Sequence, residues 1–172
     1  FEIDDSAFDG VKAWMERTTD PDTRVMGYTT RHQISSRNLD SAMRYLPADG
    51  APLAAAGLLV RHLMGERVVL NDAAARFLRE RTPRHFDPAD FVHWHLGALA
   101  LHRNGGDKWQ KWVAPVEKRL VEAQRTQDPE DRLYYGSWDP KSAWGSAGGR
   151  VYATAINLLT LMTRIRYSGK GR

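Results

Sequence analysis

The helical segments of this chain alternate between two patterns of hydrophobicity, and the alternation restricts the folds that the chain can form. Some segments carry one apolar stripe, as at Ser6–Arg17, whereas others, such as Pro52–Met64, are apolar around nearly the whole helix. A helix with one apolar stripe covers a single neighbour, but a helix that is apolar on every side must be enclosed by protein. The alternation therefore predicts an outer layer of helices around an inner layer.

Each predicted outer helix is followed by an inner helix, so the chain divides into three pairs. The outer segments are 6–17, 72–82 and 107–120, and the inner segments are 52–64, 91–101 and 151–165. Asn71 or Asp72 can cap the second outer helix, and Asp87 with Pro88 is a typical helix start. A further short helix is expected at 38–45. The pairs are interpreted as weak internal repeats, which bury their apolar faces by stacking on their neighbours.

Composition excludes several classes of protein. The 172 residues, 42% of them hydrophobic, suffice for a single domain over 1–172, and no apolar run is long enough to span a membrane. Because the first residue is Phe1, we expect this domain to be part of a longer protein, which leaves the compartment open. The chain has no cysteine, and its net charge of +4 is concentrated in the tail 164–172 without interleaved aromatic residues. We therefore expect no disulfide, no thiolate metal site and no nucleic-acid partner.

The last third of the chain carries a recognisable series of motifs. Gln124 ends an outer helix and is followed by Gly136-Ser137-Trp138-Asp139-Pro140, Trp144-Gly145, Gly148-Gly149-Arg150-Val151-Tyr152 and Thr154-Ala155. This series resembles the prenyltransferase and squalene-cyclase repeat, whose QW motif joins a glutamine at the end of an outer helix to a Gly-x-Trp. The gap between Gln124 and Trp138 is longer than in the usual motif. Segments 27–28, 56–59 and 94–106 also look like their counterparts in bacterial proteins of this superfamily.

The resemblance covers most of the chain and implies a particular all-α architecture. It implies an α/α toroid, here a partial or small barrel of about three outer–inner helix hairpins. Closed members of the family generally contain more pairs. The expectation is therefore either a toroid fragment with further repeats upstream, or a small barrel that covers itself by association.

The physical properties of the same residues predict a structural junction. Gly136 permits a tight turn, and the large ring of Trp138 suits burial between the two layers. The indole N–H then needs an acceptor, such as a carbonyl at a helix end or the side chain of Gln124. Gly148-Gly149 before Arg150 leaves backbone N–H groups free to bind an anion, although glycine at this position more often only permits a turn.

Catalytic motifs are weak. Cyclases of the superfamily use an Asp-x-Asp-Asp-Thr acid, but the nearest match, Asp4-Asp5-Ser6, lies at a helix start where capping explains it. Zinc-dependent prenyltransferases use a cysteine, and His93 and His95 point about 200 degrees apart on a helix, so no metal or other cofactor is predicted. The Cys-x-x-Gln of complement-like thioester domains is also missing. Asp139 and His95 remain as weak catalytic candidates, and an Asp-Pro turn is the alternative explanation for Asp139.

The inner ends of the helices are expected to form one concave, mainly aromatic surface. Its predicted lining consists of Tyr28, His32, Trp94, His95, Trp138, Trp144, Arg150 and Tyr152. The favoured hypothesis is a non-catalytic binding or interaction module for a peptide, protein or apolar small molecule. The alternative is a terpenoid cyclase-like or prenyltransferase-like enzyme acting on an isoprenoid, with Asp139 or a histidine as acid or base. An enzyme requires a deep cavity holding such a group, whereas a module can have a filled centre.

Overall fold

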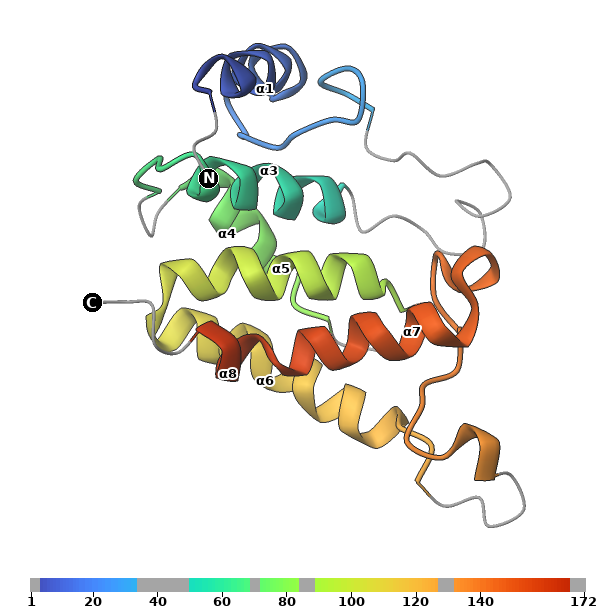
Figure 1. The fold of residues 1–172 in the computed structure, drawn as a ribbon. Helices are drawn as coiled ribbons and strands as arrows, with labels where there is room; N and C mark the ends of the chain where they lie inside the picture. The colour runs from blue at the N-terminus through green and yellow to red at the C-terminus, as the bar shows by residue number, and fades with distance from the viewer. Residues whose placement is uncertain (1–3, 34–49, 69–71, 84–88, 127–131, 168–172) are drawn as a thin grey trace.

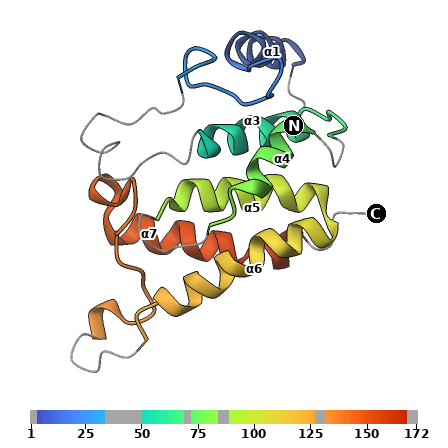
Figure 2. The same cartoon turned by 180° about the vertical axis from the view of Figure 1, so that it is seen from behind.

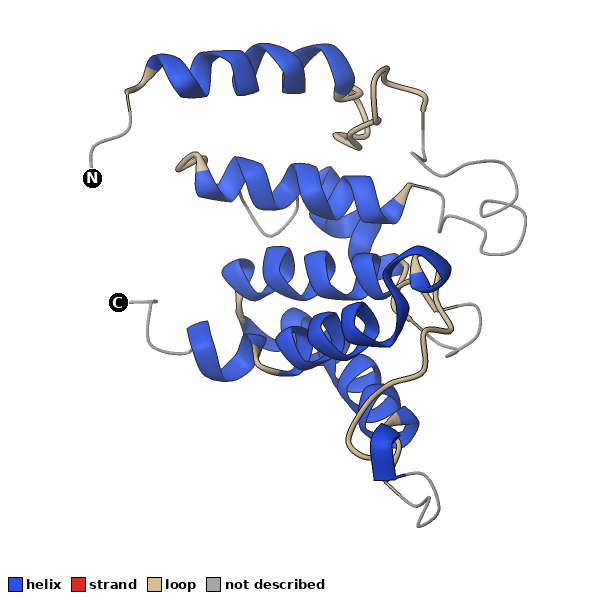
Figure 3. Ribbon diagram, turned by 45° about the vertical axis from the view of Figure 1, so that its right-hand side comes forward, coloured by secondary structure: helices blue, strands red, loops and turns tan. Residues whose placement is uncertain are grey.

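The computed structural model describes residues 4–33, 50–68, 72–83, 89–126 and 132–167. Every regular element in these ranges is helical, which confirms the predicted all-α class (Figure 3). The elements are α1 (Ser6–Thr18), α3 (Ala51–Leu63), α4 (Ala73–Glu80), α5 (Phe91–Asn104), α6 (Gly106–Ala123), the 3-10 turn η1 (Arg132–Tyr134), α7 (Gly145–Leu161) and α8 (Thr163–Tyr167). The helix predicted at 38–45 and the start predicted at Asp87-Pro88 lie outside the described residues. None of the helices in the described ranges has the length and apolar character that crossing a membrane requires.

The helices are arranged as a stack (Figure 1). Helices α3, α5 and α7 lie one below another, and α5 packs against both α3 and α7. Helices α4 and α6 lie on one side of these three, as the view from behind also shows (Figure 2). Helix α4 packs on α3, and α6 packs on α5 and α7. Helix α1 lies at the end of the stack next to α3, so α1 and α7 are at opposite ends.

Local polar contacts set the helix starts. The side chain of Asp72 accepts hydrogen bonds from the N–H groups of Ala74 and Ala75 at 2.9 and 3.3 Å, which confirms it as the cap of α4. Asp90 caps α5 by accepting from the N–H of His93 at 3.1 Å. The prediction of Ser6 as the cap of α1 is wrong. Ser6 is already helical, and its own N–H donates to Asp4 at 2.8 Å.

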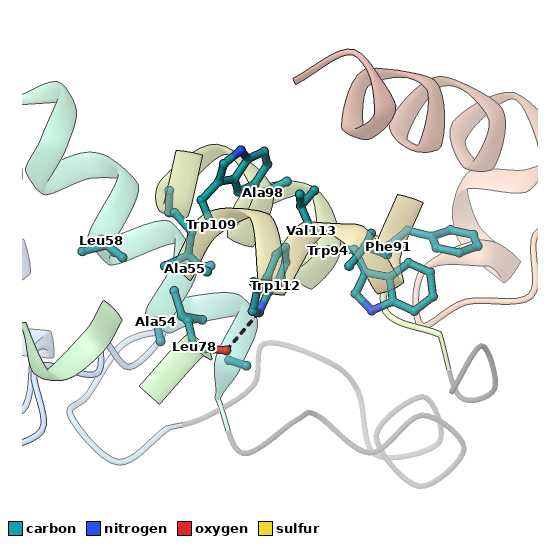
Figure 4. Close-up of a cluster of buried hydrophobic side chains, with 14 of the residues drawn as sticks. Ala54, Ala55, Leu58, Leu78, Phe91, Trp94, Ala98, Trp109, Trp112 and Val113 are labelled. Carbon is teal, nitrogen blue, oxygen red and sulfur yellow. Dashed lines mark hydrogen bonds between the residues drawn. The ribbon is translucent and has the colours of Figure 1, made fainter. Parts of the chain in front are cut away.

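The core fills the space between the two groups of helices (Figure 4). Phe91 and Trp94 from α5 meet edge to face, and the indoles of Trp109 and Trp112 enter from α6. The close approach of α6 to α5 depends on Gly97, because a Cβ at this position would lie 2.6 Å from the ring of Trp112. Four large aromatic rings therefore occupy the centre of the stack.

Glycine and proline act differently in the last two long helices. Pro115 lies inside α6, where it removes one helical hydrogen bond. Gly149 interrupts α7 with a φ of +64° and a ψ of −165°, so a short turn at 145–148 is followed by the main helix from Arg150. The turn expected at Gly148-Gly149 is thus present, and the main helix begins close to the predicted start at residue 151. A residue with a side chain would be strained in the conformation of Gly149.

Candidate functional site

A buried tryptophan ties the end of α6 to the segment that leads into α7. Trp138 is only 2% exposed, and its indole Nε1–H donates to the carbonyl of Leu120 at 2.7 Å. Beside it, Nε2 of Gln124 donates to the carbonyl of Gly136 at 2.7 Å. The prediction that Trp138 is buried and that its indole donates to a helix-end carbonyl is confirmed.

A second tryptophan makes a similar bond earlier in the chain. The indole of Trp112 donates to the carbonyl of Leu78 at 3.0 Å, near the end of α4 (Figure 4). The last turn of each of these two helices is therefore bound to the indole of a later tryptophan. Sequence reasoning missed the bond of Trp112, because this residue lies within a helix and has no neighbouring Gly-x-Trp.

The carboxylate of Asp139 is held by two arginines. Arg125 donates to it through Nε and Nη2 at 3.1 and 2.9 Å, and Nη2 of Arg150 lies 2.7 Å from Oδ1. The guanidinium of Arg150 also lies 4.0 Å from the centre of the Tyr134 ring. The hydrogen bond to Arg125 and the further bond to Arg150 lower the pKa of Asp139. An ionised carboxylate has no proton to donate, so this geometry opposes a general-acid role for Asp139.

The second catalytic candidate, His95, lies half-buried on α5. Its Nδ1 is 3.2 Å from the hydroxyl oxygen of Thr160 on α7, so the two side chains join these helices. Burial lowers the pKa of His95, which favours the neutral ring. His95 and Asp139 share no hydrogen bond or ion pair among the described residues, and the two candidates form no acid–base pair.

The eight residues predicted to line one concave surface do not form it. Trp94, like Trp138, is a core residue, with 3% exposure. The exposed Tyr28 and His32 belong to the segment after α1, at the end of the stack away from α7 (Figure 1). Trp144, Arg150 and Tyr152 are half-buried at the beginning of α7, and His95 is half-buried on α5. Aromatic residues near helix ends were predicted to line a concave surface. Two of them, Trp94 and Trp138, are instead buried and pack in the core.

Two sizeable hollows on the described surface include neither Asp139 nor His95 in their linings. One, of about 410 Å³, lies between α1 and the end of α3. The other, of about 530 Å³, lies at the ends of α3 and α5 beside α8, and is lined by Leu59, His62, Leu63, Leu99, His102, Arg103 and Tyr167. Burial lowers the pKa of both histidines in this lining. In the described ranges, no group of three or more His, Cys, Asp or Glu side chains is placed to hold a metal ion.

Helix α7 exposes an apolar face, and on the short helix α8 that follows it Ile165 is exposed next to the exposed Arg166. Val151 and Ile165 are 83% and 74% exposed, Leu158 is 49% exposed, and Ala155, Leu159 and Met162 add to the same face. The opposite face is buried although it carries polar side chains, namely Asn157, Thr160 and Thr163. The segment was predicted to be enclosed on every side, and this prediction is wrong for the described structure. Ala153 is also buried there, and Tyr152, Ile156 and Leu161 pack against the core, so α7 presents apolar residues on both its inner and its outer face.

The apolar face of α7 lies between two arginines whose charges are neutralised by ion pairs. No charged residue occurs from Val151 to Thr163, and Arg150 and Arg164 stand on either side of this segment. The guanidinium of Arg164 pairs with Glu117 on α6 at 3.0 Å, and Arg150 pairs with Asp139. The exposed face of α7 therefore has no charged residue along its length. The arginines on either side of it, Arg150 and Arg164, are already held in ion pairs.

Comparisons of the chain with protein-family models, with curated proteins and with solved structures find no match.

Proposed function

We propose that this chain is a non-catalytic protein-interaction module, built as a short arc of paired helices of the α/α-toroid type found in the prenyltransferase and squalene-cyclase repeat superfamily. The side-by-side packing of α3, α5 and α7, with α4 and α6 on one side, supports this architecture. The similar bonds from Trp112 and Trp138 to helix-end carbonyls support the repeat.

One observation carries the proposed function, namely the apolar character of the exposed face of α7. Fully burying a Val, Leu or Ile side chain contributes about 1.5–3 kcal/mol, and contiguous exposed apolar patches typically mark interaction sites. Val151, Leu158 and Ile165 lie exposed on one helix face, whereas Asn157 is completely buried on the other. A partner that covers the exposed face would bury apolar side chains that this chain alone leaves in contact with water.

The surroundings of the two catalytic candidates support a module over an enzyme. Asp139 uses both carboxylate oxygens in ion pairs with Arg125 and Arg150, and His95 lies against Thr160. Both side chains thus have structural partners. A binding role needs neither of them as an acid or base.

Site-specific photocrosslinking tests the proposed function. A benzophenone amino acid replaces Leu158 in the protein expressed in its native host, and a matched variant carries it at Glu122, an exposed position on α6. We expect a discrete crosslinked species from position 158 that the variant at position 122 does not give. Equal, diffuse labelling at both positions, or no crosslink at position 158, would contradict an interaction role for this face.

A further inference from the structure

We infer that the occupant of the exposed α7 face is a second copy of this chain, packed antiparallel about Leu158. The inference rests on the proposed interaction function and names its partner. It is carried by the spacing of the apolar residues, by the charges around them and by the symmetry of the face.

The exposed apolar residues have the spacing of a coiled-coil seam. Val151, Ala155, Leu158, Met162 and Ile165 follow one another at intervals of four, three, four and three residues. This pattern is the a/d repeat through which two helices pack side by side. The complementary surface for such a seam is the apolar seam of another helix, and a second copy of the chain supplies one.

The charges around the seam favour an identical partner. An acidic or basic partner would gain no ion pair along 151–163, which is uncharged, and the flanking Arg150 and Arg164 already pair with Asp139 and Glu117. A copy of the same uncharged face meets no electrostatic penalty. The seam is therefore complementary to itself.

The charge beyond the seam selects the antiparallel orientation. Arg166 is exposed and forms no ion pair among the described residues. A parallel pair would bring the two copies of Arg166 together, whereas an antiparallel pair centred on Leu158 separates them by about 24 Å along the helix axis. In an antiparallel pair the two helix dipoles also point in opposite directions, so the positive end of each helix lies beside the negative end of the other.

The seam is nearly symmetric about Leu158, as a two-fold interface requires. Val151 and Ile165 are each seven residues from it, and both are β-branched. A two-fold axis beside Leu158 places the small Ala155 opposite the larger Met162 of the second copy. The face is about 22 Å long and about 10 Å wide, smaller than the roughly 800 Å² per partner of a standard interface. We therefore expect a weak, reversible dimer rather than a permanent one.

Sedimentation equilibrium of the purified chain from low micromolar to submillimolar concentration tests the dimer. We expect a reversible monomer–dimer equilibrium that Leu158→Glu weakens by about tenfold or more, because two carboxylates then meet at the two-fold axis. The matched control is Leu133→Glu, which makes the same change at a residue that is 90% exposed on η1, and it should leave the equilibrium unchanged. A chain that stays monomeric, or a dimer insensitive to Leu158→Glu, overturns the inference.

Cysteine crosslinking tests the orientation with milder substitutions. The chain contains no cysteine, so each variant carries a single thiol. Leu158→Cys brings two thiols together at the axis and should give a disulfide-linked dimer on oxidation. Val151→Cys places its thiols about 21 Å apart in the antiparallel pair, too far for a disulfide. Efficient linkage through both positions indicates a parallel pair and overturns the antiparallel arrangement.

The two proposals fail in different ways. A purified chain that remains monomeric, combined with a discrete crosslink from position 158 to a different protein, overturns the second copy and leaves the interaction function standing. The absence of both dimer and crosslink overturns both.

Discussion

The indole N–H of Trp138 donates a hydrogen bond of 2.7 Å to the carbonyl of Leu120 in the last turn of α6. The last four carbonyls of a helix have no partner within the helix, so a buried helix end needs a hydrogen-bond donor such as this indole N–H. Trp112 serves the end of α4 in the same way through Leu78. Both bonds stabilise a helix end and also connect two units of the stack.

Removing the indole donor should destabilise the fold. Trp138→Phe keeps an aromatic ring but leaves the carbonyl of Leu120 without this bond, and the cost should be about 1–3 kcal/mol. Urea unfolding followed by circular dichroism measures the loss of unfolding free energy. Trp14→Phe is the control, because Trp14 is 36% exposed on α1, and its change should stay within about 0.5 kcal/mol. Equal stability losses in the two variants would show that the bond of Trp138 is not important.

Two glycine-to-alanine substitutions should change stability in opposite directions. At Gly97 the added Cβ would lie 2.6 Å from the ring of Trp112, and such overpacking costs about 1–3 kcal/mol. At Gly10, inside α1, the added Cβ meets nothing within 4 Å, so Gly10→Ala should stabilise the chain by about 0.5–1 kcal/mol. Thermal unfolding of both variants measures the contrast. A neutral Gly97→Ala would refute the close approach of α5 and α6.

The ion pairs of Arg61 should make a large contribution to stability. Its guanidinium is buried and bonds to Glu66 at 2.6 and 2.7 Å and to Asp72 at 2.9 Å. Arg61→Met leaves the buried carboxylate of Asp72 uncompensated, and such a change costs about 3–5 kcal/mol. Arg24→Met removes a more exposed and longer contact to Glu66, so its cost should be about 1 kcal/mol or less. Denaturant titration of both variants tests the difference.

Stability should fall as the pH falls below neutrality. Burial lowers the pKa of His95 and, together with Arg103 and Arg164, of His102, while the unfolded chain keeps values near 6.5. Below that pH the unfolded state binds more protons than the folded state. The histidine contribution is therefore fully present above about pH 6.5 and is lost as the pH falls through the lowered folded-state values.

Melting temperatures between pH 7.5 and 5 test this dependence. We expect the parent chain to lose more stability over this interval than the variant His95→Gln, which lacks one of the titrating groups. Identical slopes for the two proteins would be inconsistent with a lowered pKa of His95 in the folded chain.

Local signals explain what the sequence predicts well. Asp72 caps α4 because its short side chain reaches two free N–H groups, and this preference is visible in the sequence. Trp138 was predicted to be buried with a helix-end acceptor, because a large ring with one polar atom has few other arrangements. These predictions need only the chemistry of a few neighbouring residues.

Long-range packing explains what the sequence does not predict. The residues from Val151 to Ile165 are so rich in apolar side chains that no face stands out, and only the structure shows that Asn157 packs inward while Leu158 is exposed. The role of Asp139 depends on Arg125 and Arg150, which lie on either side of it in the sequence and converge only in the folded chain. Composition along a helix does not determine which neighbour each face meets.

The acceptors of the two tryptophan bonds are main-chain carbonyls, and this has a consequence for how such a chain can change. Every residue type offers the same carbonyl, so at the buried positions 78 and 120 one apolar side chain can replace another of similar size without removing the acceptor of the indole bond. The connection between these elements therefore does not depend on which apolar side chain the two positions carry. A fold connected through main-chain acceptors can therefore be retained after the sequences that adopt it have diverged.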